Sequence, residues 1–184
     1  VSQGAAAAGR IGMTLAAVRA LQMLGQAWID TQVSRFGGLV ARREFAALNA
    51  LFRRRAESSL AVVAGGGLVF LALVCALRWL RHPLADRMLD PLTTAVLLAG
   101  ALLSQTSNSL SASLRAHKQE PVMVLSVMTS LGVGGAVWLL GSRLGALGAA
   151  SGSTAVWAVN VLWNWRIWTR CRREWHAVTG SASG

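Results

Sequence analysis

Residues 59–80, SLAVVAGGGLVFLALVCALRWL, run almost to their end without a charged side chain. An α-helix needs about 20 apolar residues to cross the roughly 30 Å hydrocarbon core of a bilayer. An apolar run of this length is the usual sign of a membrane-spanning helix. More than any other feature, this stretch restricts the chain to folds that surround it with lipid or with other apolar helices.

The composition extends that restriction to the whole chain. Of 184 residues, 54% are hydrophobic and only 14% are charged, and the mean hydropathy is +0.48. Soluble domains contain about 25% charged residues, so this inventory is too poor in charge to build a water-facing surface. We therefore expect an all-α integral membrane protein.

Five segments have the length and apolarity of spanning helices: residues 11–30, 59–80, 91–113, 122–141 and 145–168. Asp90 before Pro91 and Glu120 before Pro121 are helix-start signals. The short segment GSRLG (141–145) predicts that the last two helices are antiparallel neighbours. Residues 1–10 would form an N-terminal flank, and residues 169–184 a basic tail with a disordered end.

Residues 42–57 form an amphipathic connection between the first two of these helices. Phe45, Leu48 and Phe52 recur at i, i+3 and i+7 among arginines. This spacing favours a helix lying along the inner membrane surface. A solvated connector is the alternative.

Basic residues are unevenly divided between the two sides of this predicted bundle. One side would carry twelve: Arg35, Arg42, Arg43, Arg53, Arg54, Arg55, Arg115, Lys118, Arg166, Arg170, Arg172 and Arg173. The other would carry five: Arg10, Arg78, Arg81, Arg87 and Arg143. The positive-inside rule then puts the C-terminus in the cytoplasm. Because the chain starts at Val1 with no signal peptide, we expect a fragment of a longer protein.

Signals for other classes of function are weak. The net charge is +11, and the basic residues that produce it are clustered between the apolar runs. This arrangement suits binding to anionic lipid headgroups better than binding to nucleic acid. Two cysteines and three histidines have neither disulfide nor metal spacing. The glycine-rich stretches GAAAAGRIG and GALGAASG do not follow a predicted strand, so their sequence context does not support a nucleotide-binding site. We expect no cofactor, no metal and no catalytic site.

Polar residues recur at helical spacing inside the apolar segments. Three segments carry such a stripe: Arg19, Gln22, Gln26 and Asp30 in the first, Ser104, Asn108, Ser111 and Arg115 in the third, and Ser153, Trp157, Asn160 and Asn164 in the fifth. Charged and amide groups inside a membrane usually face water or a partner. The stripes therefore predict a shared hydrated cavity. The alternative is that they are hydrogen-bonding contacts between helices, and that Arg19 pairs internally or extends to the interface.

Three stretches carry a family resemblance. They are GRIGMTLAAVRALQMLGQAWIDTQVSRFGGLVARREFAALNALFRRR (9–55), SASLRAHKQEP (111–121) and GSRLGALGAA (141–150). In order and spacing they resemble bacterial polysaccharide flippases of the Wzx type, within the multidrug/oligosaccharidyl-lipid/polysaccharide exporter superfamily. The resemblance covers most of residues 9–170.

The resemblance implies a two-lobed transporter in the bacterial cytoplasmic membrane, with this chain forming most of a six-helix C-terminal lobe. The missing N-terminal lobe, membrane lipids and a lipid-linked oligosaccharide would be its partners. The substrate would be an undecaprenyl-pyrophosphate-linked glycan, moved from the inner to the outer leaflet. Eight residues are candidates for binding it: Arg19, Gln22, Gln26, Ser104, Asn108, Ser111, Arg115 and Asn160.

Other functions stay open. A multidrug or cation exporter of the same superfamily would need an intramembrane carboxylate, for which Asp30 is the candidate. A non-transporting scaffold would use the polar stripes only for helix contacts. An accessory to a membrane glycosyltransferase is disfavoured because acidic metal-binding motifs are missing.

Overall fold

The computed structural model describes residues 5–31, 38, 42, 45–116 and 122–181. Its described elements are α1 (Ala5–Asp30), α3 (Phe45–Trp79), the 3₁₀ helix η1 (Pro83–Arg87), α4 (Pro91–Ala116) and α5 (Val122–Ser181). This part of the chain contains no strand, so the prediction of an all-helical fold is confirmed for it.

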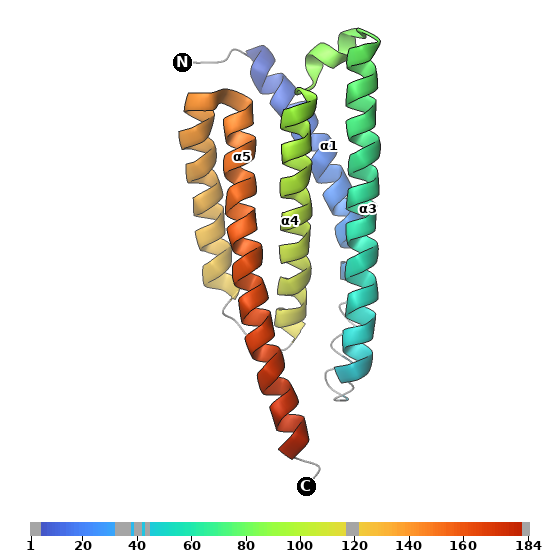
Figure 1. Ribbon diagram of the computed structural model, residues 1–184, viewed down its shortest axis with the longest axis vertical. Coiled ribbons are helices and arrows are strands. Elements are labelled where there is room, and N and C mark those ends of the chain that lie inside the picture. The colour runs from blue at the N-terminus through green and yellow to red at the C-terminus, as the bar shows by residue number, and fades with distance from the viewer. Residues whose placement is uncertain (1–4, 32–37, 39–41, 43–44, 117–121, 182–184) are drawn as a thin grey trace.

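The helices form one bundle with α4 in the middle (Figure 1). Helix α4 contacts α5 on one side and the pair α1 and α3 on the other. Helix α1 crosses behind α3 and α4 at an angle. The start of α1, η1 and the bend of α5 lie at the upper end of Figure 1, and the end of α5 lies at the lower end.

Helix α5 is a hairpin rather than one rod. Gly145 has φ 65° and ψ −146°, a conformation that breaks the helix and favours glycine. The two halves then run antiparallel and close together (Figure 1). A Cβ on Gly148 would lie 2.3 Å from the Leu140 carbonyl oxygen, so only glycine allows this approach.

The structure corrects the expectation of a separate surface helix over residues 42–57. From Phe45 onward this segment is the first part of α3, which continues without a break to Trp79. No proline or glycine interrupts the sequence before Gly65, and the Arg53–Glu57 pair at i, i+4 supports the helix across the junction. Residues 43–44 lie outside the described residues.

Two more boundaries differ from the sequence prediction. Helix α1 begins at Ala5, inside the predicted flank, because residues 5–8 are alanines, which favour helix. Helix α5 continues to Ser181, through most of the predicted tail, and no proline stops it. Residues 182–184 lie outside the described part.

The connection between α3 and α4 is held onto α1. The Leu89 backbone N–H donates to the Thr14 hydroxyl at 3.2 Å. Asp90 caps α4, since its carboxylate accepts from the Thr93 backbone N–H at 2.9 Å and from the Thr93 hydroxyl at 2.5 Å.

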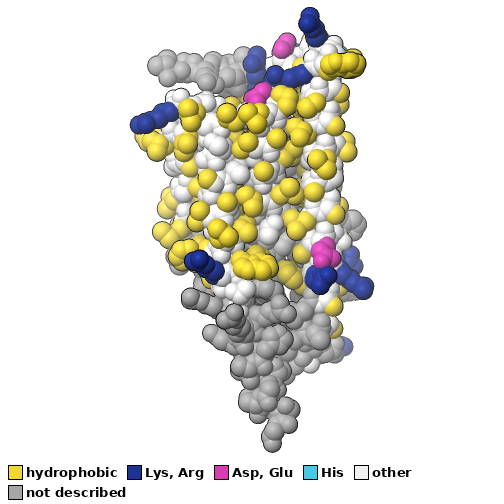
Figure 2. Space-filling model, in the orientation of Figure 1, with side chains coloured by type: hydrophobic (Ala, Val, Ile, Leu, Met, Phe, Trp, Pro, Cys, Tyr) yellow, Lys and Arg dark blue, Asp and Glu magenta, His cyan; other side chains and the backbone are white. Residues whose placement is uncertain are grey.

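In the described part of the chain, burial does not follow side-chain polarity as it does in a soluble domain. Buried side chains are polar as often as apolar, whereas many large hydrophobic side chains are exposed, including Met23, Leu68, Leu131 and Leu162. Figure 2 shows hydrophobic side chains over the middle of one face and charged ones toward its two ends. By length and composition, the described helical segments 50–79 and 125–167, the second of which bends at Gly145, are long and apolar enough to cross a membrane.

Candidate functional site

A groove of about 370 Å³ lies between α1 and α5, with α4 as its floor. Its walls are mainly apolar, formed by side chains such as Leu15 on α1, Leu97 on α4 and Val133 on the first half of α5. Polar groups enter from three helices: Arg19 and Gln22 from α1, Ser104 from α4, and Ser153 and Trp157 from α5. The groove therefore combines an apolar body with a few polar groups, as small-molecule sites do.

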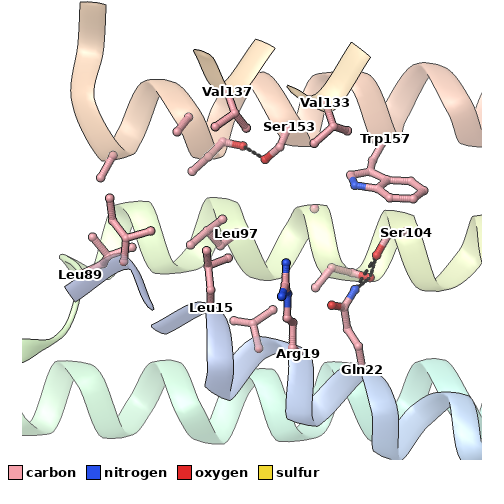
Figure 3. A pocket seen from close by; sticks show the side chains of 17 residues that line it. Leu15, Arg19, Gln22, Leu89, Leu97, Ser104, Val133, Val137, Ser153 and Trp157 are labelled. Carbon is pink, nitrogen blue, oxygen red and sulfur yellow. Dashed lines mark hydrogen bonds between the residues drawn. The ribbon is translucent and has the colours of Figure 1, made fainter. Parts of the chain in front are cut away.

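Arg19 provides the charge in this groove. Its side chain extends from α1 into the space facing α5, as Figure 3 shows. No hydrogen bond or ion pair joins it to any other residue that the structure describes. A guanidinium has five N–H donors, so it can bind an anion here, with a geometry suited to phosphate or carboxylate.

Gln22 is fixed to the floor of the groove. Its amide nitrogen donates to the Ser104 hydroxyl at 2.5 Å, and Ser104 in turn donates to the Ala101 carbonyl at 2.9 Å (Figure 3). These bonds join α1 to α4. Two predicted site residues thus meet, and they also act as a contact between helices.

Gln26 belongs to a different contact. The Gln105 side-chain amide donates to Gln26 Oε1 at 3.1 Å and to the Ser59 hydroxyl at 2.7 Å. Gln105 is only 1% exposed and connects α4 to both α1 and α3. Gln26 does not line the groove that Arg19 faces.

Sequence reasoning missed Gln105. It lies one residue after Ser104 and therefore about 100° around the helix from the predicted stripe. A tally of every amide in the apolar segments, on all faces, would have found it.

A second, smaller cavity of about 70 Å³ lies between α4 and both halves of α5. Its lining is polar and includes three predicted site residues, Asn108, Ser111 and Asn160. Ser107, Thr129 and Asn164 also line it and form a polar cluster with Asn160.

Hydrogen bonds hold this cluster together. Ser107 donates to Asn160, and Asn160 donates to Thr129 on the first half of α5. Asn164 donates to Ser107 at 2.7 Å and to Asn160 at 2.9 Å. The side-chain oxygen Oδ1 of Asn164 is buried and has no hydrogen-bond partner among the described residues. It can therefore accept a hydrogen bond from a water molecule or another donor.

The predicted stripes therefore line two spaces rather than one. Arg19, Gln22 and Ser104 border the larger groove, whereas Asn108, Ser111 and Asn160 border the smaller cavity. Trp157 lines both and separates them. Arg115 lies on α4, but its side chain is outside the described part of the chain.

Among the described residues, no group of three or more His, Cys, Asp or Glu side chains could hold a metal ion. In comparisons with known proteins, no protein-family model, no curated protein and no solved structure matches the chain. Its function is therefore inferred from the chemistry of the groove and from the family resemblance described above.

Proposed function

We propose that this chain is part of a bacterial membrane transporter that moves an undecaprenyl-pyrophosphate-linked oligosaccharide across the cytoplasmic membrane. The observation that carries the proposal is Arg19, a guanidinium without a described partner in a mostly apolar groove near the middle of its helix.

A membrane location is supported by the distribution of apolar surface. The most apolar windows of segments 50–79 and 125–167 are only 17% and 6% buried within the chain. The core helix of a soluble domain would be mostly buried, because exposing Leu, Val and Met to water costs free energy. Exposing the same side chains to lipid does not. The charged side chains toward the two ends of Figure 2 would then lie in the headgroup layers.

The uneven distribution of arginine supports a cytoplasmic C-terminus. The lower end of Figure 1 includes the first turns of α3, with Arg53, Arg54 and Arg55, and the end of α5. Fewer arginines occur on the opposite side, and cytoplasmic segments carry the excess of basic residues.

Arg19 would hold the phosphate of the headgroup. A lone arginine near the bilayer centre costs on the order of 3 kcal/mol, so it favours binding an anion there. The apolar walls would contact the first part of the lipid. Gln22, which is held by its hydrogen bond to Ser104, places a side-chain amide beside Arg19. The lipid tail would remain in the bilayer while the two lobes alternate their opening.

Transport of lipid-linked glycan by the complete protein in membrane vesicles tests this role. We expect Arg19→Ala to lower the rate about tenfold or more, since a charge-assisted hydrogen bond contributes roughly 1.5–3 kcal/mol. Arg19→Lys should retain part of the activity because it keeps the charge but loses the planar fork. Arg143→Ala, which removes an arginine outside the groove, is the matched control. Unchanged transport in Arg19→Ala would exclude the proposed role.

A non-transporting scaffold is the second candidate, and the hydrogen bonds favour it. Side-chain hydrogen bonds of Gln22 join α1 to α4, those of Gln105 join α4 to α1 and α3, and those of Asn160 join α4 to α5. These contacts give most of the polar residues a purely structural role. Arg19 distinguishes the two functions, because a scaffold gains nothing from a charge that forms no hydrogen bond or ion pair with a described residue of another helix.

A further inference from the structure

A third space in the bundle lies away from Arg19. It is a groove of about 480 Å³ between α3 and the second half of α5. Helix α4 forms its floor through Thr106, Ser109 and Leu110. Helices α3 and α5 make at most marginal contact with each other in the described part of the chain, so the groove between them is open to the outside of the bundle.

The body of this groove is apolar. Phe52, Ala56 and Leu60 line it from α3, and Trp165 lines it from α5. The two floor hydroxyls are already used within α4: Thr106 donates to the Leu102 carbonyl at 2.8 Å, and Ser109 to the Gln105 carbonyl at 2.9 Å. The floor therefore has no hydroxyl proton left to donate, and an apolar chain can lie on it without leaving a donor unpaired.

Arginines are concentrated in α3 and α5 at the level of this groove. Arg53 lines it and forms an exposed ion pair with Glu57 at 2.8 Å. Arg54 and Arg55 follow on α3, and Arg166 lies on α5. The charged lining of the groove is therefore balanced, and the net positive charge at this level comes from Arg54, Arg55 and Arg166, which follow the lining residues Arg53 and Trp165 in sequence and attract anionic headgroups.

The groove spans the depth at which lipid headgroups meet acyl chains. Leu60 lies roughly 28 Å along α3 from Trp79, and Arg53 roughly 39 Å from it. The hydrocarbon core is about 30 Å thick, or about 40–45 Å with both headgroup layers. With Trp79 at one interface, Leu60 lies at the opposite edge of the hydrocarbon and Arg53 lies among the headgroups.

We propose that this groove binds an anionic glycerophospholipid of the surrounding membrane. One acyl chain lies along Leu60, Ala56 and Trp165, and the phosphate lies beside Arg53. The volume falls within the roughly 300–1,000 Å³ typical of ligand sites. This inference rests on the membrane location proposed above, but it does not depend on transport or on Arg19.

Native mass spectrometry of the purified chain, stripped of lipid in detergent, tests the site. Phosphatidylglycerol and phosphatidylcholine with the same acyl chains are titrated separately. We expect the first molecule of phosphatidylglycerol to bind more tightly. Arg53→Gln should weaken it about fivefold, which corresponds to ~1 kcal/mol, and should leave phosphatidylcholine unchanged. Arg143→Gln, at the other end of the bundle, should change neither.

A pair of tryptophan substitutions locates the bound lipid. Ala56→Trp fills the groove and should abolish the tight phosphatidylglycerol site, whereas Ala61→Trp, on an exposed part of α3 outside the groove, should preserve it. Equal binding of the two lipids, or tight binding that survives Ala56→Trp, would overturn the proposal. So would a dimer of the chain that Ala56→Trp abolishes, because the occupant would then be a second copy. Failure of the chain to float with liposomes would overturn the membrane location itself.

Discussion

Two asparagines show how position decides the role of one residue type. Asn164 is 1% exposed and donates two hydrogen bonds within the cluster between α4 and α5. Asn108 lies on the exposed side of the same small cavity. Both recur at helical spacing in the sequence, so periodicity alone could not separate a helix contact from a position open to a ligand.

We expect Asn164→Leu to lower the free energy of unfolding by about 1–2 kcal/mol, because it removes hydrogen bonds to Ser107 and Asn160 and leaves buried polar atoms unpaired. Asn108→Leu should change it by less than about 0.5 kcal/mol, as at other exposed positions. Chemical denaturation of the detergent-solubilised chain measures both. Equal losses in the two variants would contradict a structural role that belongs to Asn164.

At the scale of the element, local signals predicted most of the helices. Asp90 before Pro91 marks the start of α4, and Gly145 in GSRLG marks the break in α5. The limits of α3 and α5 were missed for one reason. Arginine-rich segments were assigned to a surface helix and a tail, yet arginine is a good helix former, and no proline interrupts either segment.

The N-cap of α4 makes a pH-dependent contribution to stability. Burial raises the pKa of Asp90, but hydrogen bonds from the Thr93 side chain and backbone and the charge of Arg78 outweigh it, so the pKa lies below its ordinary 3.8. A carboxyl with a lowered pKa in the folded state stabilises the fold fully above its unfolded value. That contribution is lost as pH falls through the folded-state value.

We therefore expect Asp90→Asn, which keeps an accepting oxygen but no charge, to be less stable than the unchanged chain at pH 7 by about 0.5 kcal/mol. The difference should shrink as pH falls below 3.8. Denaturation at several pH values measures it. A difference that stays constant with pH would mean that the charge of Asp90 contributes nothing.

At the scale of the molecule, sequence spacing predicted only part of how the polar stripes meet. The stripes of α1, α4 and α5 were expected to share one cavity. Because α4 lies in the middle, its Ser104 faces α1 while its Ser107 bonds to Asn160 on α5. Residues of all three stripes line the larger groove, whereas Asn108, Ser111 and Asn160 line the smaller cavity, and Trp157 borders both. Which stripe faces which depends on how the helices cross, and one-dimensional periodicity does not contain that information.

The proposed function requires water to reach Arg19 within the membrane. The direct measurement is the reaction of a membrane-impermeant maleimide with single cysteines, in a chain whose Cys75 and Cys171 are replaced by serine. We predict that a cysteine replacing Arg19 reacts rapidly, because it faces the groove. One replacing Leu24, an exposed apolar position on the same helix, should stay unreactive because it faces acyl chains. If both cysteines resist the reagent equally, the groove is dry and the transporter account is contradicted.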